Sequence, residues 1–146
     1  MSCDITTGAN PMRWDCTRQG CFNIHKRPKI ERFADCLPGR IAFGDVDGIV
    51  EIGGNLLVLE WKERKHLPRG QELLYTRWTA YGPATVILVV GDARDMTVDE
   101  IAFVHKGIRE PWLDSNLDSL RWMIRDWGQW ATAHPVQGRC WEASCN

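Results

Sequence analysis

The sequence of 146 residues contains no apolar run long enough to cross a membrane. The longest run, residues 85–90, is far shorter than the roughly 20 residues that a membrane-spanning helix needs. The chain also begins without the charged, apolar and small-residue order that is typical of a signal peptide. We therefore expect a cytoplasmic protein that has no membrane partner.

The sequence carries little net charge and contains no internal repeat, low-complexity tract or linker. Its 18 Lys and Arg residues are balanced by 19 Asp and Glu residues, which gives a formal net charge of −1. This balance gives no global sign of a nucleic-acid partner, although a local basic face is compatible with it. The length fits a single domain over residues 1–146 that can bury a core of its own.

The chain contains six cysteines, and a cytoplasmic location argues against a disulfide framework. Four of them form two pairs that are each separated by four residues: Cys16 and Cys21, and Cys140 and Cys145. Together the two pairs are candidate ligands of a structural Zn²⁺. Cys36, Cys3 and His25 are alternative ligands, and free thiols are the competing interpretation.

Turn-forming residues divide the first half of the chain into elements. Residues 1–28 lack sustained periodicity and are expected to form a loop-rich, Cys-containing lead-in. Pro28 and an apolar stripe predict a helix over residues 29–37. Two strands follow, over residues 40–52 and 55–62, because Gly53-Gly54 between them suits a tight hairpin turn.

The second half alternates between helices and strands. A helix is expected over residues 71–81, a strand buried on both faces over 84–90, and an edge strand over 100–106. Ser115 and Asp118 have the spacing of a capping box that begins a final helix. Its expected apolar stripe consists of Leu117, Leu120, Ile124 and Trp127. This order predicts an α/β (α+β) fold: a small mixed sheet flanked by helices, with a C-terminal helix.

Charged residues end the second strand of the predicted hairpin. Because side chains on a strand alternate, Glu60 and Lys62 lie on one face, and Trp61 lies on the other, in the core. The hairpin turn would place Asp47 near the level of Glu60. Two converging carboxylates suit Mg²⁺ or Mn²⁺, and a nearby ammonium would offset charge on a phosphate. The alternative is a solvent-exposed ion pair of little energetic value.

This arrangement resembles the PD-(D/E)xK nuclease superfamily, in which an Asp on one strand precedes Asp/Glu-x-Lys on the next. Gly44-x-x-Asp47 and Gln71-x-x-x-Tyr75 are similar to motifs of its RecB-like branch. The resemblance covers about 60 residues, which we place at 29–90. It implies a restriction-endonuclease-like core over that range, with residues 91–146 as a C-terminal strand and helix extension. It also implies a small stand-alone protein of the kind that phages encode, which would act in the host cytoplasm.

The resemblance further implies a metal-dependent DNA nuclease that hydrolyses phosphodiester bonds. Asp47 and Glu60 would bind Mg²⁺ or Mn²⁺, with the Trp61 carbonyl as an additional ligand. Lys62 would assist the attacking water. Gln71 and Tyr75 would steady the site. Glu31, with Asp35 as the alternative, is a candidate for an additional acidic ligand. Asp45 is a candidate for a second ligand or a charge at the rim. Many such nucleases pair subunits, so a homodimer is an additional expectation.

Basic residues flank the candidate site on both sides in the sequence. Arg64, Lys65 and Arg69 follow it directly, and Lys26 and Arg27 precede it. Such residues contact phosphates, so DNA is the expected partner, with RNA as an open alternative. The competing functional hypothesis is a non-catalytic nucleic-acid or protein binder on a nuclease-like scaffold, with or without stabilisation by zinc.

Overall fold

The computed structural model describes Pro28 and residues 30–137, and it divides into two units, residues 1–44 and 45–146. The described part of the first unit contains one short 3₁₀ helix, η2 (Ile30–Phe33), followed by turns up to residue 40. The α-helix predicted over residues 29–37 is therefore wrong in type and length. Phe33 of its expected apolar stripe is 50% exposed, and so short a helix without buried packing is marginal.

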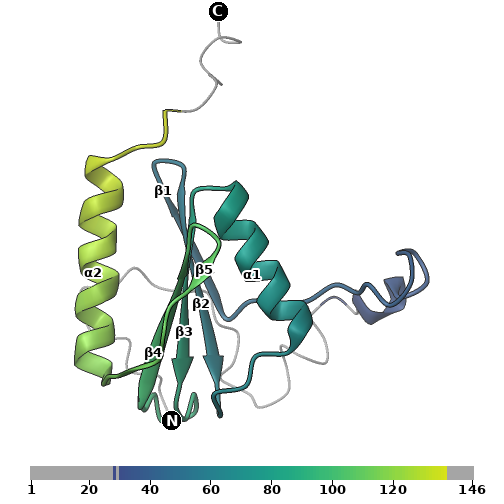
Figure 1. Ribbon diagram of the computed structural model, residues 1–146, viewed down its shortest axis with the longest axis horizontal. Coiled ribbons are helices and arrows are strands. Elements are labelled where there is room, and N and C mark those ends of the chain that lie inside the picture. The colour runs from purple at the N-terminus through teal and green to yellow at the C-terminus, as the bar shows by residue number, and fades with distance from the viewer. Residues whose placement is uncertain (1–27, 29, 138–146) are drawn as a thin grey trace, which may run out of the picture. The chain divides into compact units, whose positions relative to one another are not determined.

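The second unit is a mixed sheet between two helices (Figure 1). Within the described residues the sheet has six strands, namely β1 (Gly48–Ile52), β2 (Asn55–Lys62), β3 (Ala84–Val90), β4 (Glu100–His105), β5 (Ile108–Arg109) and β6 (Leu113–Asp114). The helices are α1 (Arg69–Tyr81) and α2 (Leu117–Ala133). The expected α+β class, with a small mixed sheet and a C-terminal helix, is confirmed.

The strand order is β1-β2-β3-β4-β5, and β6 also pairs with β4. β2 and β3 are parallel because α1 connects them as a crossover, and all other pairs are antiparallel. The strand expected over residues 100–106 is present as β4, but its position at the sheet edge is wrong. After Lys106-Gly107 the chain turns back, and two short strands pair with β4 on its outer side.

The first hairpin matches the prediction at its turn and differs at its start. Gly53 and Gly54 both have positive φ angles, 58° and 87°, and they join the paired residues Ile52 and Asn55. The strand predicted from residue 40 begins only at Gly48. In this register Asp45 would lie opposite the last residue of β2, so earlier residues have no strand partner.

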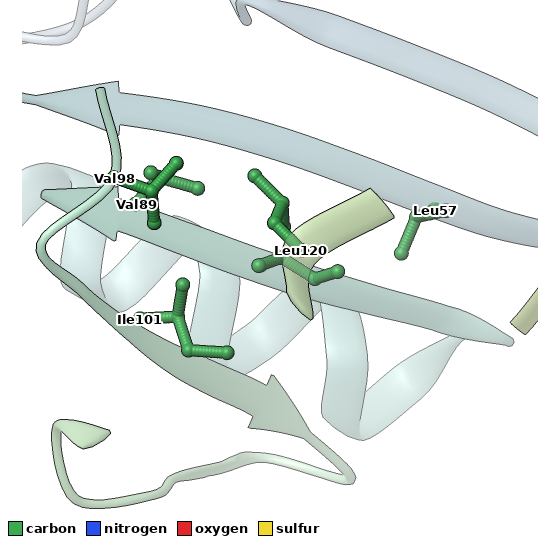
Figure 2. Packing of buried hydrophobic residues seen from close by; sticks show 6 residues of the cluster. Leu57, Val89, Val98, Ile101 and Leu120 are labelled. Carbon is green, nitrogen blue, oxygen red and sulfur yellow. The ribbon is translucent and has the colours of Figure 1, made fainter. Parts of the chain in front are cut away.

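Alternate residues of the central strands pack under different helices. On one face, Leu120 of α2 packs against residues of β2, β3 and β4, among them Leu57, Val89 and Ile101 (Figure 2). On the other face, Tyr75 of α1 packs against a second cluster that includes Val58, Val86, Leu88, Ala102 and Val104. The apolar run of β3 is thus buried on both faces from residue 86 to residue 90, as its composition predicts.

The two helices begin close to where the sequence predicts. α1 includes the expected residues 71–81 and starts two residues earlier. α2 is capped by Asn116, whose side chain accepts a hydrogen bond from Ser119 N at 2.8 Å, so the capping box predicted at Ser115 is wrong by one residue. Leu117 is 36% exposed, because the buried stripe starts at Leu120. No helix in the described ranges is both long and apolar enough to span a membrane.

Gly91 fixes the end of β3 against the end of β2, since its N–H donates to the carbonyl of Lys62 at 3.0 Å. A Cβ atom at this position would overlap the carbonyl oxygen of Thr97. We therefore expect Gly91→Ala to lower the free energy of unfolding by about 1–3 kcal/mol, as measured by urea denaturation. Gly70→Ala is the control, because a Cβ there meets no atom within 4 Å and should change stability by less than about 1 kcal/mol. Equal unfolding midpoints for both variants would contradict the expected clash.

Candidate active site at the ends of β1 and β2

Two carboxylates come together where β1 begins and β2 ends. Continuing the β1–β2 register by one residue beyond Gly48 and Leu59 places Asp47 opposite Glu60. Asp47 Oδ2 accepts a hydrogen bond from the backbone N–H of Trp61 at 2.6 Å. The hairpin therefore brings Asp47 to the level of Glu60, as the position of the Gly53-Gly54 turn predicts.

Glu60 is almost fully buried, with 5% of its surface exposed, on the face of the sheet that α1 covers. Its Oε1 atom lies 2.8 Å from Lys62 Nζ and accepts a hydrogen bond of 3.3 Å from Gln71 Nε2 of α1. Burial of a charge is costly unless it is paired, and here an ammonium and an amide satisfy the same oxygen. Glu60 thus belongs to the protein interior, whereas 21% of the Lys62 side chain is exposed, so this strand end is only partly solvated.

Three buried polar atoms at this place have no hydrogen-bond partner among the described residues. They are Glu60 Oε2, Gln71 Oε1 and the Tyr75 hydroxyl. Buried polar atoms are nearly always paired with protein groups, water or ions. Carboxylate and amide oxygens are the ligands that hard divalent cations prefer, so the available donor set fits Mg²⁺ or Mn²⁺.

The described residues contain no group of three or more His, Cys, Asp or Glu side chains that would hold a metal ion by themselves. Asp47 and Glu60 supply two carboxylates. This number suits Mg²⁺, which is usually bound by one or two carboxylates together with waters and a substrate phosphate. The site therefore fits a cation that completes its coordination with water and substrate.

Tyr75 is fully buried beside the carboxylates. Burial raises the pKa of its hydroxyl well above the usual value, and the Glu60 carboxylate and the charges of Asp47 and Asp45 raise it further. The phenol consequently keeps its proton throughout the neutral range. It is a hydrogen-bond donor placed next to acidic groups.

The basic residues that follow the site differ in their environment. Lys65 Nζ lies 2.6 Å from Glu100 Oε1, and 18% of the Glu100 side chain is exposed. Arg64 and Arg69 are exposed and form no ion pair within the described residues. Sequence reasoning missed Glu100, although its alternation with Ala102 along β4 is a signal that it faces α1.

The other residues predicted from the sequence belong to the core, to the first unit or to the part of the chain outside the described residues. Trp61 packs against the core under α2, as expected. Glu31 belongs to η2 in the first unit, and the structure does not describe its side chain. Asp35 and Cys36 of the same unit are exposed. The remaining zinc candidates and two basic residues also lie outside the described residues, namely Cys3, Cys16, Cys21, His25, Lys26, Arg27, Cys140 and Cys145.

The structure thus gathers Glu60 and Lys62 of β2, Gln71 and Tyr75 of α1, and Asp47, which immediately precedes β1. These groups can hold a hard cation, place a positive charge beside it and offer a hydroxyl as a hydrogen-bond donor. Comparisons with protein-family models, with curated proteins and with solved structures found no match for this chain.

Proposed function

We propose that the protein is a metal-dependent deoxyribonuclease that hydrolyses phosphodiester bonds. The observation that carries this proposal is the buried Glu60, which is paired with Lys62 and Gln71 and lies at the level of the exposed Asp47. The same residues carry the resemblance to the PD-(D/E)xK superfamily. On this proposal, the sheet with its α1 crossover corresponds to a restriction-endonuclease-like core, and its strand ends form the active site.

Asp47 and Glu60 would hold Mg²⁺ or Mn²⁺, together with the carbonyl oxygen of Trp61. The cation would polarise a phosphoryl oxygen and increase the acidity of a water molecule. The unpartnered Glu60 Oε2 supports this assignment, because a buried carboxylate oxygen needs a positive or hydrogen-bonding partner. A cation at this position would satisfy it.

The side chains around the carboxylates have separate roles in the proposed reaction. Lys62 places an ammonium next to Glu60, where it orients the attacking water or offsets the negative charge that develops on the phosphate. Gln71 holds Glu60 in one orientation through the hydrogen bond to Oε1. Tyr75 remains protonated and steadies the site as a donor.

Arg64 and Arg69 are the residues that we propose to contact the DNA backbone. Both are exposed and lie in the segment after Lys62, Arg64 two residues beyond the end of β2 and Arg69 at the start of α1. Lys65 contributes less to this surface, because Glu100 already neutralises its charge. Such backbone contacts supply affinity without sequence specificity and weaken with salt.

The direct test is a cleavage assay on linear duplex, single-stranded, circular and branched DNA, with RNA of the same sequence as a further substrate. Each substrate is incubated with Mg²⁺, with Mn²⁺ or with EDTA. We expect cleavage of DNA that requires the metal and stops with EDTA. Metal-independent binding of every substrate, without cleavage, would instead favour the non-catalytic binder. Sedimentation tests the expected homodimer, which should have twice the mass of one chain. Cutting of both strands of circular duplex DNA would agree with paired subunits.

Metal binding has a second, independent readout in protein stability. A ligand that binds only the folded state at about 100 times its dissociation constant stabilises that state by about 2.7 kcal/mol. We expect Mn²⁺ to raise the melting temperature of the parent protein and to have no such effect on Glu60→Gln. Glu72→Gln is a matched control, because Glu72 pairs with Arg109 at the surface, at 3.6 Å. An equal response of Glu60→Gln and the parent would exclude Glu60 as a ligand.

A further inference from the structure

A cavity of about 450 Å³ lies at the opposite end of the sheet from the carboxylates. Thr85 at the start of β3 lines it, whereas Lys62 ends the parallel strand β2. The cavity opens on the α2 face of the sheet, between α2, β4 and the turn that follows β4. None of the proposed nuclease residues lines it, so it is a separate site, and its size falls within the range of about 300–1,000 Å³ that is typical of ligand pockets.

Three aromatic side chains, Phe103, Trp127 and Trp130, form the apolar wall of this cavity. Phe103 and Trp127 are half-buried and anchored in the core, whereas 44% of Trp130 is exposed. Trp130 stacks on His134 with ring centroids 5.3 Å apart, and His134 Nδ1 lies 2.8 Å from the Trp130 carbonyl. His134 thereby covers one face of the indole and supports it as a fixed stacking surface.

Charged groups of both signs complete the lining. Lys106 and Gly107 are the two central residues of the β4–β5 turn, and both have positive φ angles, 49° and 79°. Gly107 N donates to Thr79 Oγ1 of α1 at 3.0 Å, which fixes the turn that carries Lys106. Glu110 also lines the cavity, and its N–H donates to the Phe103 carbonyl at 2.8 Å.

The residue type at position 106 is unusual for this backbone conformation. Asn, Asp and Gly are the residues that such a two-residue turn favours, because a longer side chain is strained at positive φ. The turn places the exposed Lys106 in the lining of the cavity, beside the aromatic wall. Within the described residues, Lys106 and Glu110 form no ion pair, although both line the same cavity.

We propose that this cavity binds a nucleotide. The base would stack on Trp130, as bases do on exposed aromatic rings of nucleic-acid-binding proteins. Lys106, with His105 beside it, would pair with the phosphate, and Glu110 would accept a hydrogen bond from an N–H group of the base. An apolar ligand leaves these charges unused, and a simple anion leaves the aromatic wall and Glu110 unused. The ligand is therefore an aromatic ring that carries both N–H donors and an anionic group.

This chemistry is shared by a free nucleotide and by one unpaired nucleotide of a single-stranded nucleic acid. Isothermal titration calorimetry of the full chain in EDTA distinguishes these two sources. We expect AMP and CMP to bind, and ribose 5-phosphate and adenosine to bind at least about tenfold more weakly, because each lacks one half of the contacts. Tighter binding of an oligonucleotide than of its mononucleotide indicates a strand only where Trp130→Ala removes the difference, because Arg64 and Arg69 contact DNA outside the cavity; an unchanged difference indicates a free nucleotide in the cavity.

Two substitutions test the assignment of the cavity. Trp130→Ala should weaken nucleotide binding about tenfold, the usual effect of losing one stacking surface. Lys106→Asn should leave the fold intact, since Asn-Gly suits this turn, while it weakens binding and reduces its dependence on salt. Trp122→Ala is the matched control, because Trp122 also lies on α2 and is 61% exposed but does not line the cavity.

The proposal is independent of the proposed nuclease activity, and the two can fail separately. Glu60→Gln should bind AMP with the affinity of the parent protein while it loses metal-dependent cleavage. If the parent binds no nucleotide, or if Trp130→Ala and Lys106→Asn both bind like the parent, the cavity is not a nucleotide site. Neither result bears on cleavage, which the DNA assay measures with other residues.

Discussion

Replacing Lys62 with Met is expected to slow phosphodiester cleavage about 10²–10³-fold, the usual loss when one preorganised electrostatic donor is removed from an active site. The ammonium lies 2.8 Å from Glu60 Oε1 and is 21% exposed, so it is held close to the carboxylates and still reaches solvent and substrate. Initial cleavage rates of parent and variant, measured with Mg²⁺ on the preferred DNA substrate, give the comparison. A folded Lys62→Met protein that cuts at the parental rate would show that Lys62 has no role in catalysis.

The same substitution is expected to reduce stability, because it removes the cationic partner of a buried carboxylate. Activity must therefore be compared at a temperature at which circular dichroism shows that the variant is folded. Lys62→Arg separates the two effects, since it retains the positive charge beside Glu60 but changes its position and shape. We expect it to unfold like the parent and to cleave more slowly. Arg77→Met, on the exposed surface of α1, controls for the loss of a charge elsewhere.

The parts of the fold that depend on local sequence could be predicted. Gly53-Gly54 is a two-residue turn because both positions require positive φ, and the apolar run of β3 is buried on both faces. The hairpin register follows from that turn, and it places Asp47 opposite Glu60. The main elements of the candidate site were consequently visible in a short stretch of sequence.

The parts that depend on distant partners could not be predicted. The strand that begins at Gly48 is shorter than expected, although β2 continues to Lys62, because the Trp61 N–H donates to the Asp47 side chain and not to a backbone carbonyl. The strands β5 and β6, which pair with the outer side of β4, are only two residues long. Strands this short show no alternation of apolar and polar residues from which they could be predicted. The pairing of Lys65 with Glu100 and the cavity between α2 and β4 join residues far apart in the chain.

Tyr75→Phe is expected to change the response of the protein to alkaline pH. The folded-state pKa of Tyr75 is raised above its ordinary value of 10.0, so the native state binds this proton more tightly than the unfolded chain does. This contribution is complete below pH 10.0 and is lost as the pH rises toward the folded-state pKa. By about pH 11 the parent should have lost on the order of 1 kcal/mol through this residue, and Tyr75→Phe should lose none of it.

Urea denaturation between about pH 8 and pH 11 measures the difference directly. Tyr81→Phe is the matched control, because Tyr81 is the second of only two tyrosines and is 90% exposed. It should follow the pH dependence of the parent. If Tyr75→Phe also follows the parent, the buried environment of the hydroxyl does not raise its pKa.

At neutral pH the same variant tests whether Tyr75 is present for stability or for function. Its hydroxyl is buried close to Glu60 but forms no hydrogen bond of ordinary geometry among the described residues, so its removal should change stability by no more than about 1 kcal/mol. If Tyr75 served only packing, Phe at this position would therefore serve equally well. We expect Tyr75→Phe to bind DNA like the parent and to cleave it more slowly, because the donor beside Glu60 is lost. Greater stability combined with slower cleavage would identify Tyr75 as a residue that serves the site at the expense of the fold.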